Sequence, residues 1–119
     1  MKSVNLKLLR YFFVGITGAA AGLVMGGRPV GPMDIDLRWV GGILYRNSEI
    51  EETGLAAGVL GHPALGIAWL ANKISKFGQR LEPGQVMLAG SFVRPIWAQK
   101  GDTVHGDFGP LGGIAVQFV

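Results

Sequence analysis

Residues 81–95 read LEPGQVMLAGSFVRP, and this stretch decides how the rest of the chain is interpreted. Pro83-Gly84 is typical of a tight turn, because proline presets φ at one turn position and glycine supplies the positive φ of the next. The apolar run Val86–Ala89 that follows predicts a short buried strand. Gly90-Ser91 ends the run, and Pro95 prevents the strand from simply continuing.

Ser91 is the first candidate binding residue. A buried strand that ends in a small residue and a hydroxyl brings both to the edge of the core, where the backbone can approach a ligand closely. The alternative is that Gly90-Ser91 only forms the turn at the end of the strand. A pattern this short does not decide between the two interpretations, and on pattern alone we favour the turn.

Composition indicates one globular domain that is rich in turns. Hydrophobic residues make up 49% of the 119 residues and charged residues 16%, which excludes a disordered segment. The 20 glycines follow no strict period and favour a β-rich fold. The net charge is +3, but the basic residues form no run, which argues against a nucleic-acid surface. The absence of cysteine excludes a disulfide scaffold and a thiolate zinc site.

The N-terminal 27 residues allow two interpretations. Three basic residues precede the apolar run Tyr11–Met25, and Ala19-Ala20-Ala21 offers a small-residue cleavage site, which together form the layout of a secretory signal peptide. The run is short for a membrane span and is interrupted by glycines. The second interpretation is an atypical N-terminus followed by a buried strand near residues 21–25.

A β-hairpin is predicted in the middle of the chain. Leu37–Arg46 reads as a strand with a bulge at Gly41-Gly42, and Asn47-Ser48 occupies the place of a two-residue turn. The return strand is Glu49–Thr53, with its glutamates on one face and Ile50 on the other. The cluster of glutamates at 49, 51 and 52 raises a metal hypothesis, since hard cations prefer carboxylate oxygens. We favour a solvated strand face and assign no metal ligand.

One helix is expected over residues 63–77, with Pro63 at its first position and Gly78 as its left-handed cap. His62 is expected to help cap the helix, although a role as ligand or base is also open. Lys73 and Lys76 suit the C-terminal end of the helix dipole. The apolar residues at helical spacing, which we expect to form the buried stripe, are Leu65, Trp69, Leu70, Ile74 and Phe77.

The C-terminal part predicts three short strands separated by turns. The strands are Ile96–Ala98, Thr103–Phe108 and a last one whose inward residues are Ile114, Val116 and Phe118. The turns are expected at residues 100–102 and 109–112. His105 and Asp107 share one strand face, either as an acid–base pair or, as we favour, as an exposed pair.

Several stretches, in this order, carry a resemblance to a known family: GGRPV with DLRW, YRN…IEETGLAAGVL, HPALGIAWLANK, and LEPGQVMLAGSFVRP…KGDTVHGDFGPLGGIAVQFV. From about Val24 to Val119 the chain resembles the C-terminal half of the family of 2-oxo-hept-4-ene-1,7-dioate and 2-oxopent-4-enoate hydratases. This family lies in the fumarylacetoacetate hydrolase-like superfamily, which also contains 4-oxalocrotonate decarboxylases.

The resemblance implies an α+β, β-rich fold: part of a mixed β-roll with one main helix. Residues 21–119 would be the C-terminal part of a fumarylacetoacetase-like catalytic domain, with residues 1–20 unassigned. The implied activity is that of a hydro-lyase of aromatic-compound catabolism, which adds water to a 2-oxo-alkenoate with Mg²⁺ or Mn²⁺ in its site. Gly90, Ser91 and Phe92 align with the loop that binds the substrate carboxylate. The implied compartment is the cytoplasm, with secretion as the alternative if residues 1–21 are a signal peptide.

The chain also departs from the family. The metal-binding carboxylates and the catalytic lysine lie in an N-terminal half that this sequence lacks, so no catalytic residue is assigned. The family's Asp-Asn is replaced near Thr17-Gly18-Ala19, and Gly61 stands where an asparagine is usual before His-Pro. We therefore expect a truncated gene or one piece of a split enzyme, with a homo-oligomer or a complementing N-terminal half as partner. The alternatives are a 4-oxalocrotonate decarboxylase-type enzyme, a non-catalytic partner subunit, or a secreted small β-domain.

Overall fold

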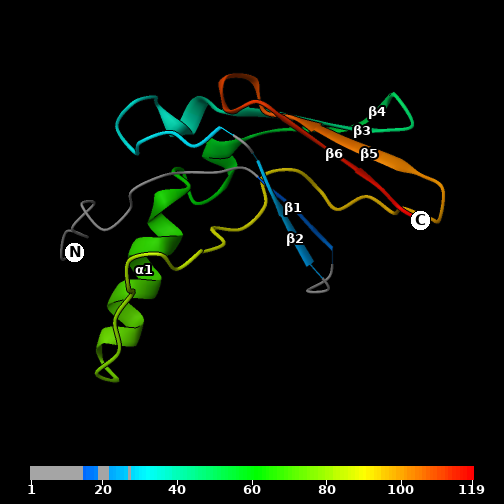
Figure 1. Ribbon diagram of the computed structural model, residues 1–119. Coiled ribbons are helices and arrows are strands. Elements are labelled where there is room, and N and C mark those ends of the chain that lie inside the picture. The colour runs from blue at the N-terminus through cyan, green and yellow to red at the C-terminus, as the bar shows by residue number, and fades with distance from the viewer. Residues whose placement is uncertain (1–14, 19–21, 27) are drawn as a thin grey trace.

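The computed structural model describes residues 15–18, 22–26 and 28–119. Its main sheet has four antiparallel strands in the order β4-β3-β5-β6. These strands are β3 (Gly41–Arg46), β4 (Glu49–Leu55), β5 (Thr103–Asp107) and β6 (Gly113–Gln117). A separate hairpin pairs β1 (Gly15–Gly18) with β2 (Gly22–Met25). The one α-helix of the described residues, α1 (Ala64–Ser75), projects away from the main sheet (Figure 1).

The predicted central hairpin is confirmed. Asn47 and Ser48 have φ of 52° and 74°, so both turn residues adopt the left-handed conformation that a two-residue turn of this type requires. The predicted bulge at Gly41-Gly42 is wrong. The register shifts instead after the pair Leu44–Glu52, because Tyr45 pairs with Ile50 and leaves Glu51 as the extra residue.

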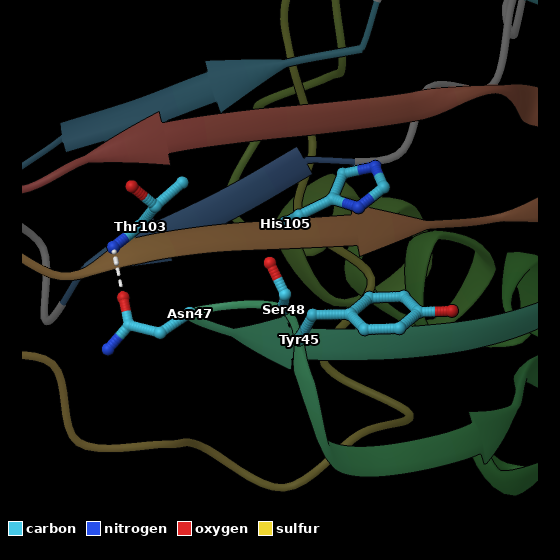
Figure 2. A pocket seen from close by; sticks show the side chains of 5 residues that line it. All are labelled: Tyr45, Asn47, Ser48, Thr103 and His105. Atoms are coloured by element: carbon cyan, nitrogen blue, oxygen red, sulfur yellow. Dashed lines mark hydrogen bonds between the residues drawn. The ribbon is translucent and has the colours of Figure 1, made fainter.

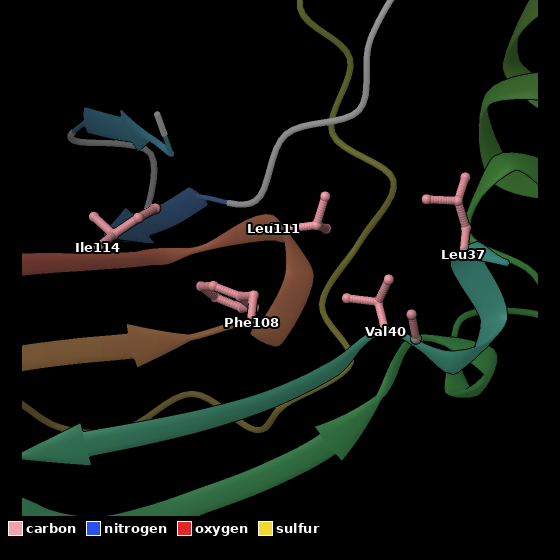
Figure 3. Packing of buried hydrophobic residues seen from close by; sticks show 6 residues of the cluster. Leu37, Val40, Phe108, Leu111 and Ile114 are labelled. Atoms are coloured by element: carbon pink, nitrogen blue, oxygen red, sulfur yellow. The ribbon is translucent and has the colours of Figure 1, made fainter. Parts of the chain in front are cut away.

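The core lies between the sheet and the turns that enter and leave it (Figure 3). Leu37 and Val40 belong to a 3₁₀ turn, Leu37–Trp39, and its last cap, where the sequence predicted the start of a strand. The side chain of Asp36 accepts a hydrogen bond from the Arg38 amide, which favours this helical turn over an extended chain. The buried residues of the cluster are Leu37, Val40, Ala56, Phe108, Leu111 and Ile114.

Two of the predicted strands are wrong. Residues 86–89 and 96–98 form no strand, although the turn at Pro83-Gly84 is present, with φ of 90° at Gly84 and a hydrogen bond from the Gln85 amide to the Glu82 carbonyl. The apolar run lacks a neighbouring strand to pair with, and Val86 and Leu88 are exposed. An apolar run predicts a strand only where the fold provides a pairing partner.

The helix is confirmed, but its predicted stripe is not buried. The His62 ring nitrogen Nδ1 accepts a hydrogen bond from the Ala64 amide at 3.1 Å, which confirms the capping role of His62. Gly78 is left-handed, with φ of 72°, and closes the C-terminal end as predicted. Within α1 only Ile67 is buried, whereas Trp69 is 63% exposed. The expectation that Trp69 faces the core is therefore wrong.

The C-terminal strands β5 and β6 are confirmed, with Val104, Gly106 and Ile114 buried as the alternation predicted. A strand is present at Gly22–Met25, near the predicted position, but its residues are exposed. Most of the segment interpreted as a signal peptide lies outside the described residues. No helix among the residues that the structure describes is both long and apolar enough to cross a membrane.

Candidate functional site

The loop that carries Gly90 and Ser91 lies beyond the end of any regular element. Gly90 has φ of 107°, a conformation that favours glycine, and this turns the chain so that Ser91 is exposed. The Ser91 hydroxyl donates a hydrogen bond to the Val93 carbonyl at 2.6 Å. Among the described residues, the main-chain N–H groups of Ser91 and Phe92 have no hydrogen-bond partner. The loop thus presents a hydroxyl and two amides to a ligand.

Phe92 fixes this loop to the hairpin. Its ring is half-buried and meets the ring of Phe108 edge-on, with centroids 6.1 Å apart. Two glycines of the hairpin make room for it. A Cβ at Gly42 would lie 2.7 Å from the Phe92 ring, and a Cβ at Gly54 would collide with the Phe92 carbonyl oxygen. Phe92 is therefore a packing residue, although the resemblance placed it in the substrate loop together with Ser91.

Two arginines hold the following residues along the hairpin. The Nε of Arg94 lies 3.3 Å from Glu52 Oε1. Arg46 donates to the Glu51 carboxylate at 2.7 Å and to the Trp97 carbonyl at 3.3 Å. Side chains thus replace the ladder hydrogen bonds that a strand would have made.

These contacts also decide the metal hypothesis for the hairpin glutamates. The carboxylates of Glu51 and Glu52 each face an arginine, which competes with a cation for the same oxygens. No group of three histidine, cysteine or acidic residues with metal-binding geometry occurs in residues 15–18, 22–26 and 28–119. The described residues do not fit a hard-cation site.

A separate surface depression of about 460 Å³ lies at the turn of the hairpin (Figure 2). Tyr45 and His105 stack on one of its sides, with ring centroids 5.4 Å apart. The Asn47 side chain accepts from the Thr103 amide at 3.0 Å and donates to Asp102 at 2.8 Å. These bonds tie the hairpin to the turn before β5. The sequence did not mark Tyr45 or Asn47 as lining a pocket, because cross-strand neighbours leave no signal in a single sequence.

His105 and Asp107 do not form an acid–base pair. His105 stacks on Tyr45, while the Asp107 carboxylate accepts a hydrogen bond from the Gly109 amide at 2.9 Å. The second alternative, that they are two separate polar residues of a strand, is the one that fits.

A second depression, of about 660 Å³, lies before α1 and includes Asp36, Arg38 and His62. The hydrogen bond from the Arg38 side chain lowers the pKa of Asp36 to about 2. This carboxylate is therefore ionised and paired at neutral pH, which does not suit a general acid or base. Neither depression includes Ser91.

Comparison with curated proteins confirms the family resemblance. The chain is 56% identical over 101 residues to a 2-oxo-hept-4-ene-1,7-dioate hydratase of Escherichia coli, a match that covers 85% of this chain and 38% of that protein. It is 32% identical over 95 residues to a 2-keto-4-pentenoate hydratase of Paraburkholderia xenovorans, covering 80% of this chain and 35% of the relative. No family model matches. The chain spans less than half the length of these relatives.

The fold is similar to that of a solved 4-oxalocrotonate decarboxylase from Pseudomonas putida G7, complexed with magnesium and adipate. The TM-score is 0.77 at 30% sequence identity, over 82% of this chain and 37% of the decarboxylase. The same protein has also been solved with calcium and acetate, with a TM-score of 0.76. A 4-oxalocrotonate decarboxylase of Pseudomonas putida is 30% identical over 115 residues, covering 97% of this chain and 44% of that protein. The expected combination of one helix with an antiparallel sheet is thus confirmed.

Proposed function

We propose that this chain, a homologue of a fragment of the 2-oxo-hept-4-ene-1,7-dioate hydratases, is one part of a hydro-lyase that adds water to a 2-oxo-alkenoate. The observation that carries the proposal is the 56% identity to the E. coli hydratase. The identity to the decarboxylases is 30%, and we therefore place the decarboxylase-type activity second. Residues 21–119 would complete a β-roll with the part of the fold that the relatives carry beyond the match. The proposed setting is cytoplasmic catabolism of aromatic compounds.

In this proposal Ser91 binds the carboxylate of the 2-oxo acid. The hydroxyl has a single proton, which now goes to the Val93 carbonyl, so the proton must turn toward the ligand when a carboxylate enters. Hydrogen bonds to an ionised acceptor are shorter and stronger than those to a carbonyl, which favours the exchange. The amides of Ser91 and Phe92 would add two further donors. Gly90 gives the chain the left-handed bend that exposes these groups.

The metal of the proposed enzyme would be held elsewhere. The decarboxylase structures contain magnesium or calcium, but the described residues of this chain do not fit a hard cation. The Mg²⁺ or Mn²⁺ ligands would therefore come from the part of the enzyme that the relatives carry beyond the match. This chain would contribute the carboxylate-binding loop and its support on the hairpin.

A hybrid protein tests the role of Ser91. In the hybrid, the matched region of the E. coli hydratase is replaced by the corresponding residues of this chain. Ser91→Ala removes a hydrogen bond to a charged group, worth about 1.5–3 kcal/mol, and should lower kcat/KM roughly ten- to a hundredfold. The loss should fall on KM if Ser91 only holds the carboxylate.

Ser75→Ala is the matched control, because the Ser75 hydroxyl is also exposed and also donates to a main-chain carbonyl, that of Asn72. The control should leave kcat/KM unchanged. Unchanged kinetics of Ser91→Ala in an active hybrid would leave Gly90-Ser91 as a turn and nothing more.

A further inference from the structure

The outer side of α1 is apolar and uncovered. Leu65, Trp69 and Phe77 are large hydrophobic residues spaced in multiples of four along the chain, and all three are exposed, Phe77 by 73%. Lys73 completes this row and is also exposed. Residues four apart lie one above another on the same side of a helix. We call these four residues the α1 face.

Nothing in the described residues packs on α1 as the strands pack on one another. The extensive contacts between elements lie within the two sheets and between two 3₁₀ turns. The loop near Ala89 approaches α1 at Gly66, where a Cβ would lie 3.5 Å from the Ala89 carbonyl oxygen. Ile67 is the single buried residue of the helix. α1 thus projects from the sheet with its Trp69 side free (Figure 1).

A helix in this position requires a partner. α1 has 12 residues, a length at which isolated helices are marginal in water, and most helical stability in proteins comes from packing of an apolar face. Only nine hydrophobic residues of the described chain are buried, whereas sixteen large ones are exposed. A core this small leaves the helix dependent on apolar surface from outside the described residues.

We propose that the α1 face is the docking surface for the part of the hydratase fold that the relatives carry beyond the match, supplied by a second polypeptide. This inference rests on the proposed function. The relatives provide the argument for the occupant, because the decarboxylase has the same fold over 37% of its length and continues for the remainder. An aromatic residue central to an exposed apolar row is the side-chain type that dominates binding energy at interfaces.

Charge argues against a second copy of this chain as the occupant. The last turn of α1 carries Lys73, followed by Lys76, and the helix contains no acidic residue. A two-fold contact between two α1 faces would bring lysines of like charge together or leave them unpaired. The chain as a whole also carries a net charge of +3. The partner should therefore combine an apolar groove with acidic residues near its rim.

Binding of the full chain to the remaining part of the E. coli hydratase, expressed separately, tests this surface. Calorimetry should show saturable one-to-one binding, and Trp69→Glu should weaken it at least about 30-fold, as expected for a central aromatic residue. Ile50→Glu is the control, since Ile50 is 59% exposed on the hairpin away from α1 and its change should leave the affinity within about twofold. Reversal of Lys73 and Lys76 to glutamate should weaken binding more at low salt than at high salt.

The hybrid protein provides a second readout that needs no association. Trp69→Glu should lower its melting temperature clearly, whereas Ile50→Glu should not. Equal effects of the two changes in both experiments, or no binding by the unmodified chain together with an unaffected hybrid, would overturn the proposal. A discrete dimer of this chain that Trp69→Glu abolishes would assign the face to a second copy. A complex that depends on Trp69 but adds no water to a 2-oxo-alkenoate would support the surface and contradict the hydratase function.

Discussion

The close approach of the Ser91 loop to the hairpin can be tested at Gly54. A methyl group at this position would collide with the Phe92 carbonyl oxygen, with the carbonyl carbon at 2.8 Å and a Val93 methyl at 3.1 Å. Two of these atoms are backbone and cannot rotate away as a flexible side chain could. Gly54→Ala should therefore push the loop off β4.

The cost can be bounded from the geometry. Extra methyl groups in packed positions typically cost 1–3 kcal/mol, and the smaller backbone entropy of alanine in the unfolded chain returns about 0.4–1 kcal/mol. The net loss of unfolding free energy should be about 1–2 kcal/mol. The loss of Phe92 packing and of the Arg94–Glu52 contact would be confined to the loop and its support.

Hydrogen exchange of the full chain, combined with urea unfolding, separates the local effect from a global one. Amides of residues 90–97 should exchange faster in Gly54→Ala, whereas those of β5 should change no more than the loss of global stability requires. Gly58→Ala is the matched control. Gly58 lies three residues after β4 with no heavy atom within 4 Å of an added Cβ, so its change should be neutral or slightly stabilising.

Equal stability of Gly54→Ala and Gly58→Ala, with unchanged exchange in residues 90–97, would refute the docking of the loop on the hairpin. In the hybrid protein, the same pair of changes should separate in KM, because only Gly54→Ala moves Ser91.

Three further outcomes are expected. The chain alone should not bind Mg²⁺ or Mn²⁺ tightly, because Glu51 and Glu52 already face arginines; micromolar, stoichiometric binding by calorimetry would contradict this. The Asn47 side chain lowers the pKa of Asp102, so the stability from this bond is present above its ordinary pKa of 3.8 and is lost as the pH falls through the lowered value. Asp102→Asn should therefore flatten the acid limb of the unfolding free energy, and an unchanged limb would refute the link. In light scattering the isolated chain should associate unevenly, because exposed apolar surface and open sheet edges invite contacts, and a clean monomer with cooperative melting would argue for an independent domain.

Local signals predicted those elements whose causes lie close together in the sequence. The Asn47-Ser48 turn, the His62 and Gly78 caps and the alternation in β5 each depend on neighbouring residues, and all are confirmed. The Gly-rich strand β3 was placed correctly, but its glycines serve distant aromatic side chains. Gly42 makes room for Phe92, 50 positions away in the sequence, and not for a bulge.

Features that depend on a partner were not predictable. Val86–Ala89 has the composition of a buried strand, but the described residues offer no strand beside it. Trp69 has the spacing of a core residue and is exposed for the same reason. The amphipathic pattern records what the sequence is suited to bury, and the structure shows which part of that surface this chain covers by itself. The Ser91 loop was located from the family resemblance, whereas its support by Gly54 and Arg94 required the structure.

The most direct measurement of the central claim is the reaction of the hybrid protein with 2-oxo-hept-4-ene-1,7-dioate in the presence of Mg²⁺. If this chain is one part of a hydratase, the hybrid should convert the substrate to its hydrated product without release of CO₂, and the isolated chain should be inactive. A hybrid that folds and melts cooperatively but adds no water to this substrate, or that releases CO₂ from a 2-oxo acid instead, would contradict the claim.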